Sequence, residues 1–256
     1  MTALWAKMTE TELKTGERIE DLQYKGLRII QNESGFRFGT DSVLLAGFVQ
    51  AGKGQRMADL GAGTGVLSIL IEGRTGAKMT AIELQPEQCS MARRSFRMNG
   101  QDIELVEADM RTAYVQLGRG VFDAAVCNPP YYPANGGAVS QKGGDGYEGA
   151  ATHDLFCTVD EVAKAASSLI KYGGKLFICC PTARLAEMIC ALTAEKLEPK
   201  RMRLAASVRG KAPYLALIEA KKGAKPGIIW EPQLDVCGED GAYTKETDCI
   251  YHRNRS

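Results

Sequence analysis

Short apolar runs alternate with amphipathic stretches along this chain of 256 residues. The runs have the length of strands, and the stretches between them carry apolar residues at helical spacing, as in the helices that begin at Val66 and Pro86. This alternation favours a parallel sheet with helices on both faces. We predict strands at residues 56–60, 78–83, 103–108, 122–127, 174–180, 201–208 and 214–220, and further helices at about 154–171 and 182–195.

The last two predicted strands are joined in a different way from the others. Residues 209–213 read Arg-Gly-Lys-Ala-Pro, a short link that is rich in turn-forming residues and leaves no room for a helix. Such a link favours a hairpin. We therefore expect the series of parallel strands to end in an antiparallel pair.

Three glycines follow the first strand at every second position, and a helix begins directly after them. Gly61, Gly63 and Gly65 let the backbone turn tightly and approach a ligand closely. Rossmann folds that bind nucleotides use a similar loop, so the glycines alone do not select a ligand. Asp59 precedes them, and a carboxylate there suits a cationic ligand amine and would repel a pyrophosphate. The loop therefore predicts a ligand that carries a positive charge.

Acidic residues also end the next two strands. Glu83, followed by Leu84, ends the strand at 78–83, where a carboxylate can bind two ribose hydroxyls. Asp109 follows the third strand and can accept a hydrogen bond from the exocyclic amine of an adenine, with Met110 packed on the ring. The alternatives are a solvated glutamate at a strand end and an ordinary acidic turn. Together the three acids predict a nucleoside ligand with a cationic amine.

A proline-rich segment, Asn128-Pro129-Pro130-Tyr131, follows the buried strand at 122–127. Proline has no N–H to donate to a ladder, so the segment leaves the sheet at the carboxyl end of a strand, where open α/β sheets bind ligands. The Asn128 side-chain oxygen and the Pro129 carbonyl can each accept one N–H of an amine, and Tyr131 can stack on its ring. The alternative is an ordinary proline turn. We predict Asn128, Pro129 and Tyr131 as catalytic residues that hold a planar NH2 group.

The composition is that of a folded domain, with 45% hydrophobic and 25% charged residues. The eight cysteines include no CxxC pair and no Cys/His cluster with zinc spacing, so we expect reduced thiols, a cytoplasmic protein and no metal. The N-terminus lacks the apolar core of a signal peptide, and no apolar stretch has membrane-spanning length. We expect a monomer that does not bind membranes.

The net charge of +1 neither favours nor excludes nucleic acid, but the charge is unevenly placed. Residues 196–225 hold nine Lys and Arg against Glu198 and Glu219. This stretch is either an RNA-binding surface that contacts phosphates or a solvated basic face. Residues 133–150 hold six glycines in 18 positions, beside the predicted target site. We expect this long loop to contact RNA and to order on binding, or to be disordered without it.

The order and spacing of these motifs resemble the class I S-adenosylmethionine-dependent methyltransferases over residues 56–131. Asp59 and the glycines resemble the first motif of that class, and the segment that begins at Asn128 resembles the motif of enzymes that methylate amino groups. The resemblance implies that S-adenosylmethionine is the cofactor, with Glu83 at its ribose and Asp109 at its adenine. Leu84, Met110 and Asn128 are predicted as further cofactor-binding residues. It also implies an α/β fold, a Rossmann-like doubly wound sheet of seven strands whose last strand is antiparallel.

A longer resemblance extends over nearly the whole chain. Residues 36–49, FRFGTDSVLLAGFV, resemble the amino-terminal signature of the bacterial tRNA1(Val) (adenine(37)-N6)-methyltransferase family, and residues 232–236 and 241–246 resemble its closing segment. This likeness implies that Thr40 and Asp41 border the methionine end of the cofactor. From the residues alone, either one is a natural N-cap of the helix that follows. Thr152 departs from the family, which often has an arginine there, so one candidate phosphate contact is missing.

These observations predict a single structural domain, with residues 1–50 as an N-terminal extension with a capping helix and residues 51–256 as the methyltransferase domain. The activity that the resemblance implies is N6-methylation of an adenine in RNA, in the anticodon loop of a tRNA. Two other enzymes remain open, a glutamine N5-methyltransferase of release factors and a ribosomal RNA guanine N2-methyltransferase. A nucleotide-binding Rossmann protein without enzymatic activity is a further alternative.

Overall fold

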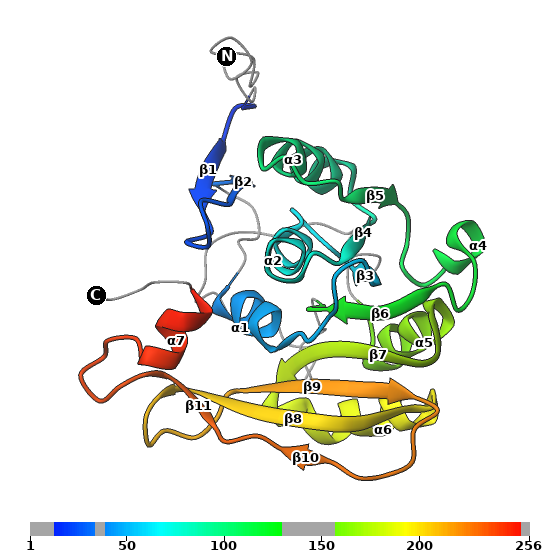
Figure 1. Ribbon diagram of the computed structural model, residues 1–256, viewed down its shortest axis with the longest axis vertical. Helices are drawn as coiled ribbons and strands as arrows, with labels where there is room; N and C mark the ends of the chain where they lie inside the picture. The colour runs from blue at the N-terminus through cyan, green and yellow to red at the C-terminus, as the bar shows by residue number, and fades with distance from the viewer. Residues whose placement is uncertain (1–12, 34–38, 130–156, 252–256) are drawn as a thin grey trace.

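The structure is a computed structural model that describes residues 13–33, 39–129 and 157–251 (Figure 1). Several predictions from the sequence fall on positions outside these ranges. They concern Tyr131, Thr152, the loop at 133–150, and residues 36–38 of the amino-terminal signature. The stacking role of Tyr131 and the RNA contact of the loop therefore stay predictions.

One mixed sheet of nine strands organises the described part of the chain. Its strands, in order across the sheet, are β10 (Ile229–Trp230), β8 (Leu197–Val208), β9 (Leu215–Lys222), β7 (Ile170–Pro181), β6 (Phe122–Cys127), β3 (Arg56–Leu60), β4 (Lys78–Glu83) and β5 (Glu104–Glu107), with β11 (Leu234–Cys237) also beside β8. Neighbouring strands run parallel except for β9, which is antiparallel to both β7 and β8. The predicted fold class and its closing hairpin are confirmed.

The sheet has two strands more than the seven that were expected. β10 has two residues and β11 has four, and both pair with β8 in parallel. Runs this short carry no periodicity that a sequence pattern can reveal. The C-terminal tail therefore returns along β8 and extends the sheet beyond its hairpin.

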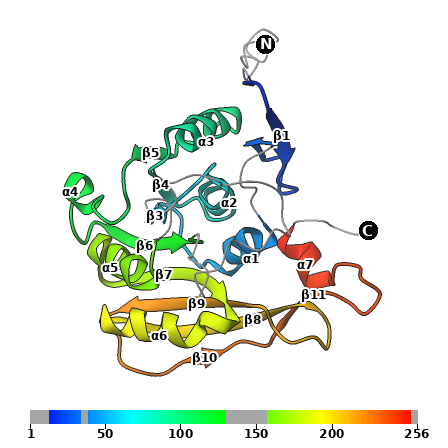
Figure 2. The ribbon, with the colours of Figure 1, turned by 180° about the vertical axis from the view of Figure 1, so that it is seen from behind.

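Helices cover both faces of the sheet, as Figures 1 and 2 show from opposite sides. They are α1 (Thr40–Phe48), α2 (Val66–Thr75), α3 (Pro86–Met98), α4 (Tyr114–Leu117), α5 (Val159–Leu169), the single turn η2 (Thr182–Arg184), α6 (Leu185–Ala194) and α7 (Lys245–Ile250). One hydrophobic cluster lies under α1, α2 and α3, and the other under α4, α5 and α6. No helix within the described ranges is long and apolar enough to cross a membrane.

The two clusters alternate along the strands, as the pleat requires. In β6, Ala124 and Val126 belong to the α1 side, whereas Ala125 and Cys127 belong to the α5 side. The next residue, Asn128, therefore continues toward the α1 side. This alternation decides which helix can contact the predicted catalytic amide.

The N-terminal segment forms a hairpin that the sequence reading did not predict. β1 (Glu17–Asp21) pairs antiparallel with β2 (Arg28–Asn32), and the Ile30 N–H donates to Ser95 Oγ of α3 at 2.9 Å. Leu22 and Ile29 share the hydrophobic cluster of α1 and α2. The hairpin and α1 are therefore packed into the same core as the sheet.

Several element ends differ from the prediction for local reasons. α5 begins at Val159 because Thr158 forms a capping box with Glu161, whereas the predicted helix began near 154. The N-cap of α1 is Gly39, which makes no side-chain cap, so the expectation that Thr40 or Asp41 caps this helix is wrong. Thr40 is the first residue of α1 and Asp41 lies in its first turn.

Candidate active site

The carboxyl ends of β3, β4, β5 and β6 meet at one edge of the sheet. Leu60 of β3 pairs with Ile82 of β4 and with Cys127 of β6, and β5 runs beside β4 as far as Glu83. The loops that follow these strand ends therefore lie side by side. This is the edge at which open α/β sheets bind ligands.

The glycines of the first loop have two different uses. Their φ angles are +68° at Gly61, +56° at Gly63 and +88° at Gly65, a left-handed conformation that favours glycine. A Cβ at Gly61 or Gly63 would meet no atom of the described residues within 4 Å, so this part of the structure leaves space beside the backbone there. A Cβ at Gly65 would lie 2.5 Å from the Phe96 ring. Gly65 therefore lets α2 pack against α3, whereas Gly61 and Gly63 leave room for a ligand.

Asp59 is buried and holds the start of α2. Its Oδ2 accepts hydrogen bonds from the Ser68 N–H at 3.0 Å and from the Ser68 hydroxyl at 2.7 Å, which satisfies an N–H that the first turn of a helix leaves free. Burial raises the pKa of Asp59 to about 7 against these hydrogen bonds, and the nearby Glu83 adds to the rise. Oδ1 has no hydrogen-bond partner among the described residues. One oxygen of Asp59 therefore positions the loop, whereas the buried Oδ1 is an unsatisfied acceptor within the described residues.

Glu83 ties the Gly-rich loop to the end of β4. Its Oε2 accepts from the Gly63 N–H at 2.8 Å, and its Oε1 accepts from the N–H groups of Leu84 at 2.9 Å and Gln85 at 2.8 Å. These bonds fix the carboxylate at the edge where the ribose is predicted to bind. Leu84 beside it is exposed. The ribose contact itself stays a prediction.

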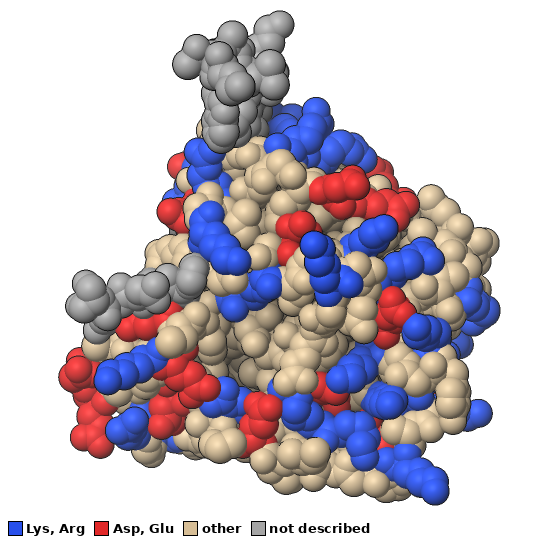
Figure 3. All heavy atoms as spheres, in the orientation of Figure 1, with Lys and Arg blue, Asp and Glu red and all other residues tan. Residues whose placement is uncertain are grey.

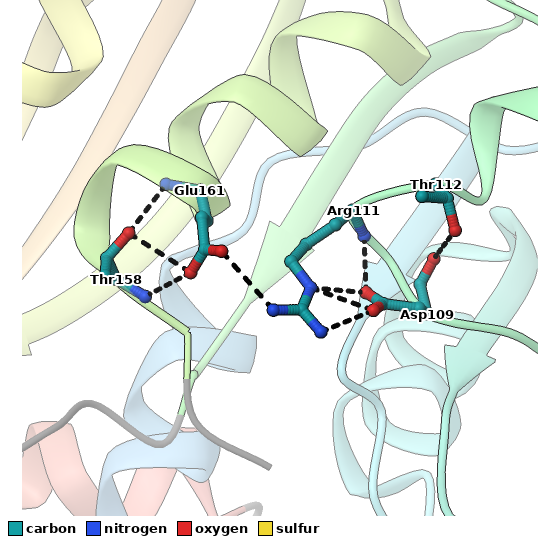
Figure 4. A network of polar contacts seen from close by, with 5 residues as sticks. All are labelled: Asp109, Arg111, Thr112, Thr158 and Glu161. Atoms are coloured by element: carbon teal, nitrogen blue, oxygen red, sulfur yellow. Dashed lines mark hydrogen bonds and ion pairs between the residues drawn. The ribbon is translucent and has the colours of Figure 1, made fainter. Parts of the chain in front are cut away.

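Asp109 forms an ion pair with Arg111, a residue that the sequence reading did not single out (Figure 4). Arg111 Nη2 and Nε lie 2.6 Å and 2.8 Å from Asp109 Oδ2, and the Arg111 N–H donates to Oδ1 at 2.8 Å. Burial raises the pKa of Asp109, but the bonds and charge of Arg111 outweigh burial and leave the pKa below its ordinary value. An adenine amine would therefore have to share this carboxylate with Arg111.

The same arginine also reaches the start of α5. Arg111 Nη1 lies 3.3 Å from Glu161 Oε1, and Glu161 closes the capping box with Thr158. Figure 4 shows Arg111 lying between Asp109 and Glu161. Met110, which lies between Asp109 and Arg111 in the chain and was predicted to pack on the adenine ring, is buried in the cluster on the α5 side of the sheet. The end of β5 and the first turn of α5 are thus joined through one side chain.

Two neighbours hold the Asn128 side chain in one orientation. Its Nδ2 donates to Ser42 Oγ of α1 at 2.9 Å, and its Oδ1 accepts from the Cys179 thiol of β7 at 3.1 Å. Burial raises the pKa of Cys179 well above its ordinary value, so the thiol keeps the hydrogen that it donates. A carbonyl oxygen has two lone pairs, so Oδ1 can accept a second hydrogen bond from a substrate. Pro129, which follows, is buried.

Neither neighbour of Asn128 was identified from the sequence. Ser42 lies in the amino-terminal signature, but its place on the inner side of α1 is visible only once the helix is docked. Cys179 looked like one more apolar residue of a buried strand. The alternation of side chains along a strand places Cys179 on the α1 side of the sheet, the side toward which Asn128 continues. This alternation is the sequence signal that could have identified Cys179 as a neighbour of Asn128.

Asp41 lies next to Ser42 in the first turn of α1, at the same edge as Asn128. The Tyr214 hydroxyl donates to Asp41 Oδ1 at 3.0 Å. Burial raises the pKa of Asp41, and the bond from Tyr214 opposes part of that rise. The predicted cofactor residue Asp41 is therefore held by Tyr214, the residue directly before β9. The sequence did not predict this contact.

The basic stretch at 196–225 does not form one surface. Its two ends lie together at one edge of the sheet, because Leu197 pairs with Lys222 at the amino end of β8, whereas the hairpin link in its middle lies at the carboxyl end of β8. The exposed lysines away from the site are Lys196, Lys221 and Lys225, and the exposed cations at the site edge are Arg209 and Lys211. Figure 3 shows Lys and Arg interspersed with Asp and Glu on the face drawn.

The two arginines in the middle of the stretch make internal contacts. Arg201, whose side chain is 13% exposed, pairs with Glu219 at 2.9 Å and Glu231 at 2.8 Å, and its guanidinium stacks on the Phe48 ring at 3.7 Å. Arg203, at 15% exposed, pairs with Glu246 at 2.7 Å. The expectation that the whole stretch offers phosphate contacts is therefore wrong at these positions. Both arginines fasten the C-terminal tail to β8.

Two hollows within the described ranges lie away from this edge. One of about 510 Å³ is lined by Gly52, Asp123 and Lys175, and one of about 480 Å³ is lined by Gly120, Tyr172 and Lys222. These residues precede or begin the parallel strands, or end β9, and so mark the opposite edge of the sheet. The predicted site residues lie at the carboxyl ends of the strands and do not line these hollows.

The residues at the carboxyl edge fit S-adenosylmethionine. Open space borders Gly61 and Gly63, and the buried Asp59 Oδ1 lacks a partner among the described residues. A nearby carboxylate, Glu83, suits ribose hydroxyls. No group of three or more His, Cys, Asp or Glu that could hold a metal ion is found within the described ranges. The donor set at this edge is that of an organic, cationic ligand.

Comparison with solved structures agrees with this fold. The predicted O-methyltransferase Atu636 from Agrobacterium tumefaciens has a TM-score of 0.67 at 24% identity, with 83% of this chain and 96% of that chain covered. The Thermus thermophilus 16S rRNA N2 G1207 methyltransferase has a TM-score of 0.58 at 18% identity, with 82% of this chain and 52% of that chain covered. The sequence of residues 34–142 matches the family described as "Methyltransferase small domain".

Fold and family match together define an S-adenosylmethionine-dependent methyltransferase of class I. A relative from Shewanella halifaxensis, named tRNA1(Val) (adenine(37)-N6)-methyltransferase, is 30% identical over 234 residues, which are 86% of this chain and 93% of the relative. A relative of the same name from Tolumonas auensis is 26% identical over 87% of this chain. The chain belongs to the tRNA1(Val) (adenine(37)-N6)-methyltransferase family.

Proposed function

We propose that this enzyme methylates the N6 atom of an adenine in the anticodon loop of a tRNA. The observation that carries the proposal is the Asn128 amide, which Ser42 and Cys179 hold at the carboxyl edge with one lone pair of Oδ1 left for a substrate N–H. The relatives that share most of the chain are named for this reaction on valine tRNA. Family and site thus support the same target group.

The chemistry asks mainly for positioning. An adenine amine is a weak nucleophile because its lone pair is delocalised into the ring. Hydrogen bonds from its two N–H groups to Asn128 Oδ1 and to the Pro129 carbonyl favour a pyramidal nitrogen and aim the lone pair. S-adenosylmethionine supplies the activated methyl group. Each neutral hydrogen bond contributes only about 0.5–1.5 kcal/mol net, so the fixed placement of the amine has to supply most of the rate enhancement.

The target base has to leave its stack to reach Asn128. Unstacking costs less in an anticodon loop than in a duplex, and stacking on Tyr131 would return about 1–3 kcal/mol. This role of Tyr131 is part of the proposal and comes from the sequence. It explains why an aromatic residue follows the two prolines.

We place the RNA backbone at the hairpin between β8 and β9. Arg209 and Lys211 are exposed there, at the same edge as Asn128, and among the described residues the Arg209 side chain pairs only with Asp235, at 3.6 Å. Exposed cations beside the site supply the salt-dependent part of RNA affinity. This smaller surface replaces the full stretch at 196–225 as the proposed partner surface.

The test is to incubate the purified enzyme with labelled S-adenosylmethionine and three substrates in parallel: total tRNA, ribosomal RNA and a release factor. We expect label in tRNA, and mass spectrometry of its nucleosides should identify N6-methyladenosine. The same nucleoside should be lost from the tRNA of a deletion strain. Label only in the release factor would show that the target group is a glutamine amide and not an adenine. Label in guanine of ribosomal RNA would show that the target group is the N2 amine of guanine.

A further inference from the structure

Tyr214 is fixed in place by its own backbone, from both sides. Its N–H donates to the Ala205 carbonyl of β8 at 2.9 Å, and its carbonyl accepts from the Thr182 N–H after β7 at 3.0 Å. The Thr182 hydroxyl also donates to the Pro213 carbonyl at 2.9 Å. The residue thus joins the ends of two strands and has little freedom to move.

That side chain contacts one carboxylate. The Tyr214 hydroxyl donates to Asp41 Oδ1 at 3.0 Å, and Asp41 is the neighbour of Ser42, which binds Asn128. Asp41 is also close enough to act electrostatically on Cys179, the second partner of Asn128. The Tyr214–Asp41 pair therefore lies directly beside the residues that hold the target amine, and it adds a carboxylate to this cluster.

We propose that Tyr214 is a positioning residue for the cofactor: its hydroxyl holds the Asp41 carboxylate in place for the ammonium group at the methionine end of S-adenosylmethionine. This inference rests on the proposed role of Asp41 and not on the identity of the RNA. The ammonium carries a full positive charge, so a carboxylate fixed in advance binds it without the cost of ordering a free side chain.

The pair has a characteristic dependence on pH. Burial raises the pKa of Asp41, and the Tyr214 hydrogen bond lowers it again in part. Removing the hydroxyl therefore moves the pKa of Asp41 further up, and the carboxylate is neutralised at a higher pH. The other titratable groups that act on the pair are Cys179 of β7 and Tyr251 after α7. Burial keeps the Cys179 thiol neutral, and its partner Asn128 carries no charge.

The experiment measures the affinity for S-adenosylmethionine by calorimetry across pH, without any methyl acceptor. Tyr214→Phe keeps the ring and removes the bond to Asp41. We expect about tenfold weaker binding at neutral pH, which corresponds to about 1.4 kcal/mol. We also expect the loss of binding on acidification to begin at a higher pH than in the wild type. Tyr172→Phe is the matched control, because Tyr172 is 79% exposed and donates to the Gly223 carbonyl at the opposite edge.

A double-mutant cycle shows whether Tyr214 acts through Asp41. In the Asp41→Asn background, Tyr214→Phe should have little further effect on affinity. S-adenosylhomocysteine keeps the ammonium but lacks the sulfonium charge. Tyr214→Phe should weaken its binding by the same factor as the binding of S-adenosylmethionine. If Tyr214→Phe leaves the affinity for S-adenosylhomocysteine unchanged, the ammonium assignment is overturned. Additive effects of the two substitutions would overturn the positioning role.

The outcomes also separate this inference from the proposals on which it rests. Wild-type affinity in Asp41→Asn would refute the cofactor role of Asp41 itself. A loss in Asp41→Asn with none in Tyr214→Phe would refute only the role of Tyr214. Thermal unfolding of each variant reports on the fold independently, and a Tyr214→Phe enzyme that melts as the wild type but binds less well supports the inference.

Discussion

Cys179 donates its thiol hydrogen to Asn128 Oδ1 at 3.1 Å. The pairing of β6 and β7 explains this contact, because Cys127 pairs with Ile178 and the two following residues are therefore level with each other. The strand next to the predicted catalytic segment thus supplies the group that orients its amide. A thiol is a weak donor, so it fixes the orientation of the amide while leaving the oxygen free to accept a stronger bond from a substrate.

Asn128→Ala should abolish methyl transfer and leave cofactor binding nearly intact. The substitution removes the proposed acceptor of the reacting amine, and losses of oriented polar groups of this kind cost about 100-fold or more in rate. Single-turnover methylation measures the chemical step, and calorimetry with S-adenosylmethionine is the control. A single-turnover rate equal to that of the wild type would show that Asn128 does not hold the amine.

Gly63→Ala should mainly lower the affinity for the cofactor, whereas Gly65→Ala should mainly lower stability. Both positions have positive φ, so each substitution costs about 1–2 kcal/mol in backbone strain. At Gly65 the new Cβ also meets the Phe96 ring, and overpacking adds about 1–3 kcal/mol to the loss of stability. At Gly63 the Cβ enters open space, so the main loss should be in cofactor affinity. Denaturant unfolding and calorimetry on both variants check this contrast. Equal losses of stability in the two variants would contradict it.

Stability should depend on pH through Asp59. Burial raises the pKa of this carboxyl from 3.8 to about 7 in the folded protein. Its favourable contribution is therefore complete below about pH 4 and is lost as the pH rises to about 7. The loss amounts to roughly 4 kcal/mol for a shift of this size. Asp59→Asn cannot ionise, so its unfolding free energy should change less between pH 4 and 7 than that of the wild type. Parallel pH profiles for the two proteins would contradict the assignment.

Arg201→Ala should destabilise the fold rather than weaken RNA binding directly. Arg201 is nearly buried and neutralises Glu219 beneath the C-terminal tail. Removing one partner of a buried pair costs about 3 kcal/mol or more when the other charge is left alone. Lys175 lies 2.6 Å from Glu219 and still pairs with it, so we expect a loss of about 1–3 kcal/mol. Urea unfolding gives the loss of stability. Lys221→Ala on the neighbouring β9 is the control, because that side chain is exposed and should change stability by less than about 0.5 kcal/mol.

The double substitution Arg209→Glu and Lys211→Glu should weaken RNA binding without changing stability. Both side chains are exposed at the edge that carries Asn128. The slope of log affinity against log salt should flatten by about one unit for each phosphate that the variant no longer neutralises. The matched control reverses the charge of Lys196 and Lys225 at the opposite edge, which keeps the net charge change the same. Equal slopes in the two double variants would argue against the hairpin as the RNA surface.

The sequence predicted the elements that depend on local chemistry. The apolar runs placed β3, β4 and β6 at their observed bounds, because buried parallel strands are continuously apolar and end at turn residues. The glycines, Glu83 and Asn128 were brought to one edge, because parallel strands place their carboxyl ends together. The class of enzyme followed from the order of these motifs.

The remaining contacts depend on packing between distant segments, which periodicity does not report. Arg201 and Arg203 looked like free cations until the tail was seen to return over β8 with Glu231 and Glu246. Tyr214 looked like the first residue of a strand, and its bond to Asp41 spans 173 positions of sequence. Charge counts along a chain cannot distinguish a cation that meets solvent from one that already has an internal partner.

The shared partner of Asp109 and Glu161 has a consequence for how this enzyme can change in evolution. Arg111 binds one acid at the end of β5 and another at the first turn of α5, so loss of Arg111 leaves two acids without their shared cation, and loss of either acid removes one of the two links that join β5 to α5. Drift at one of them is then tolerated only with a compensating change nearby. Across homologues, positions 109, 111 and 161 should accordingly covary as a triplet, and the predicted adenine end of the cofactor site should be slow to diversify for reasons that lie partly in the neighbouring helix.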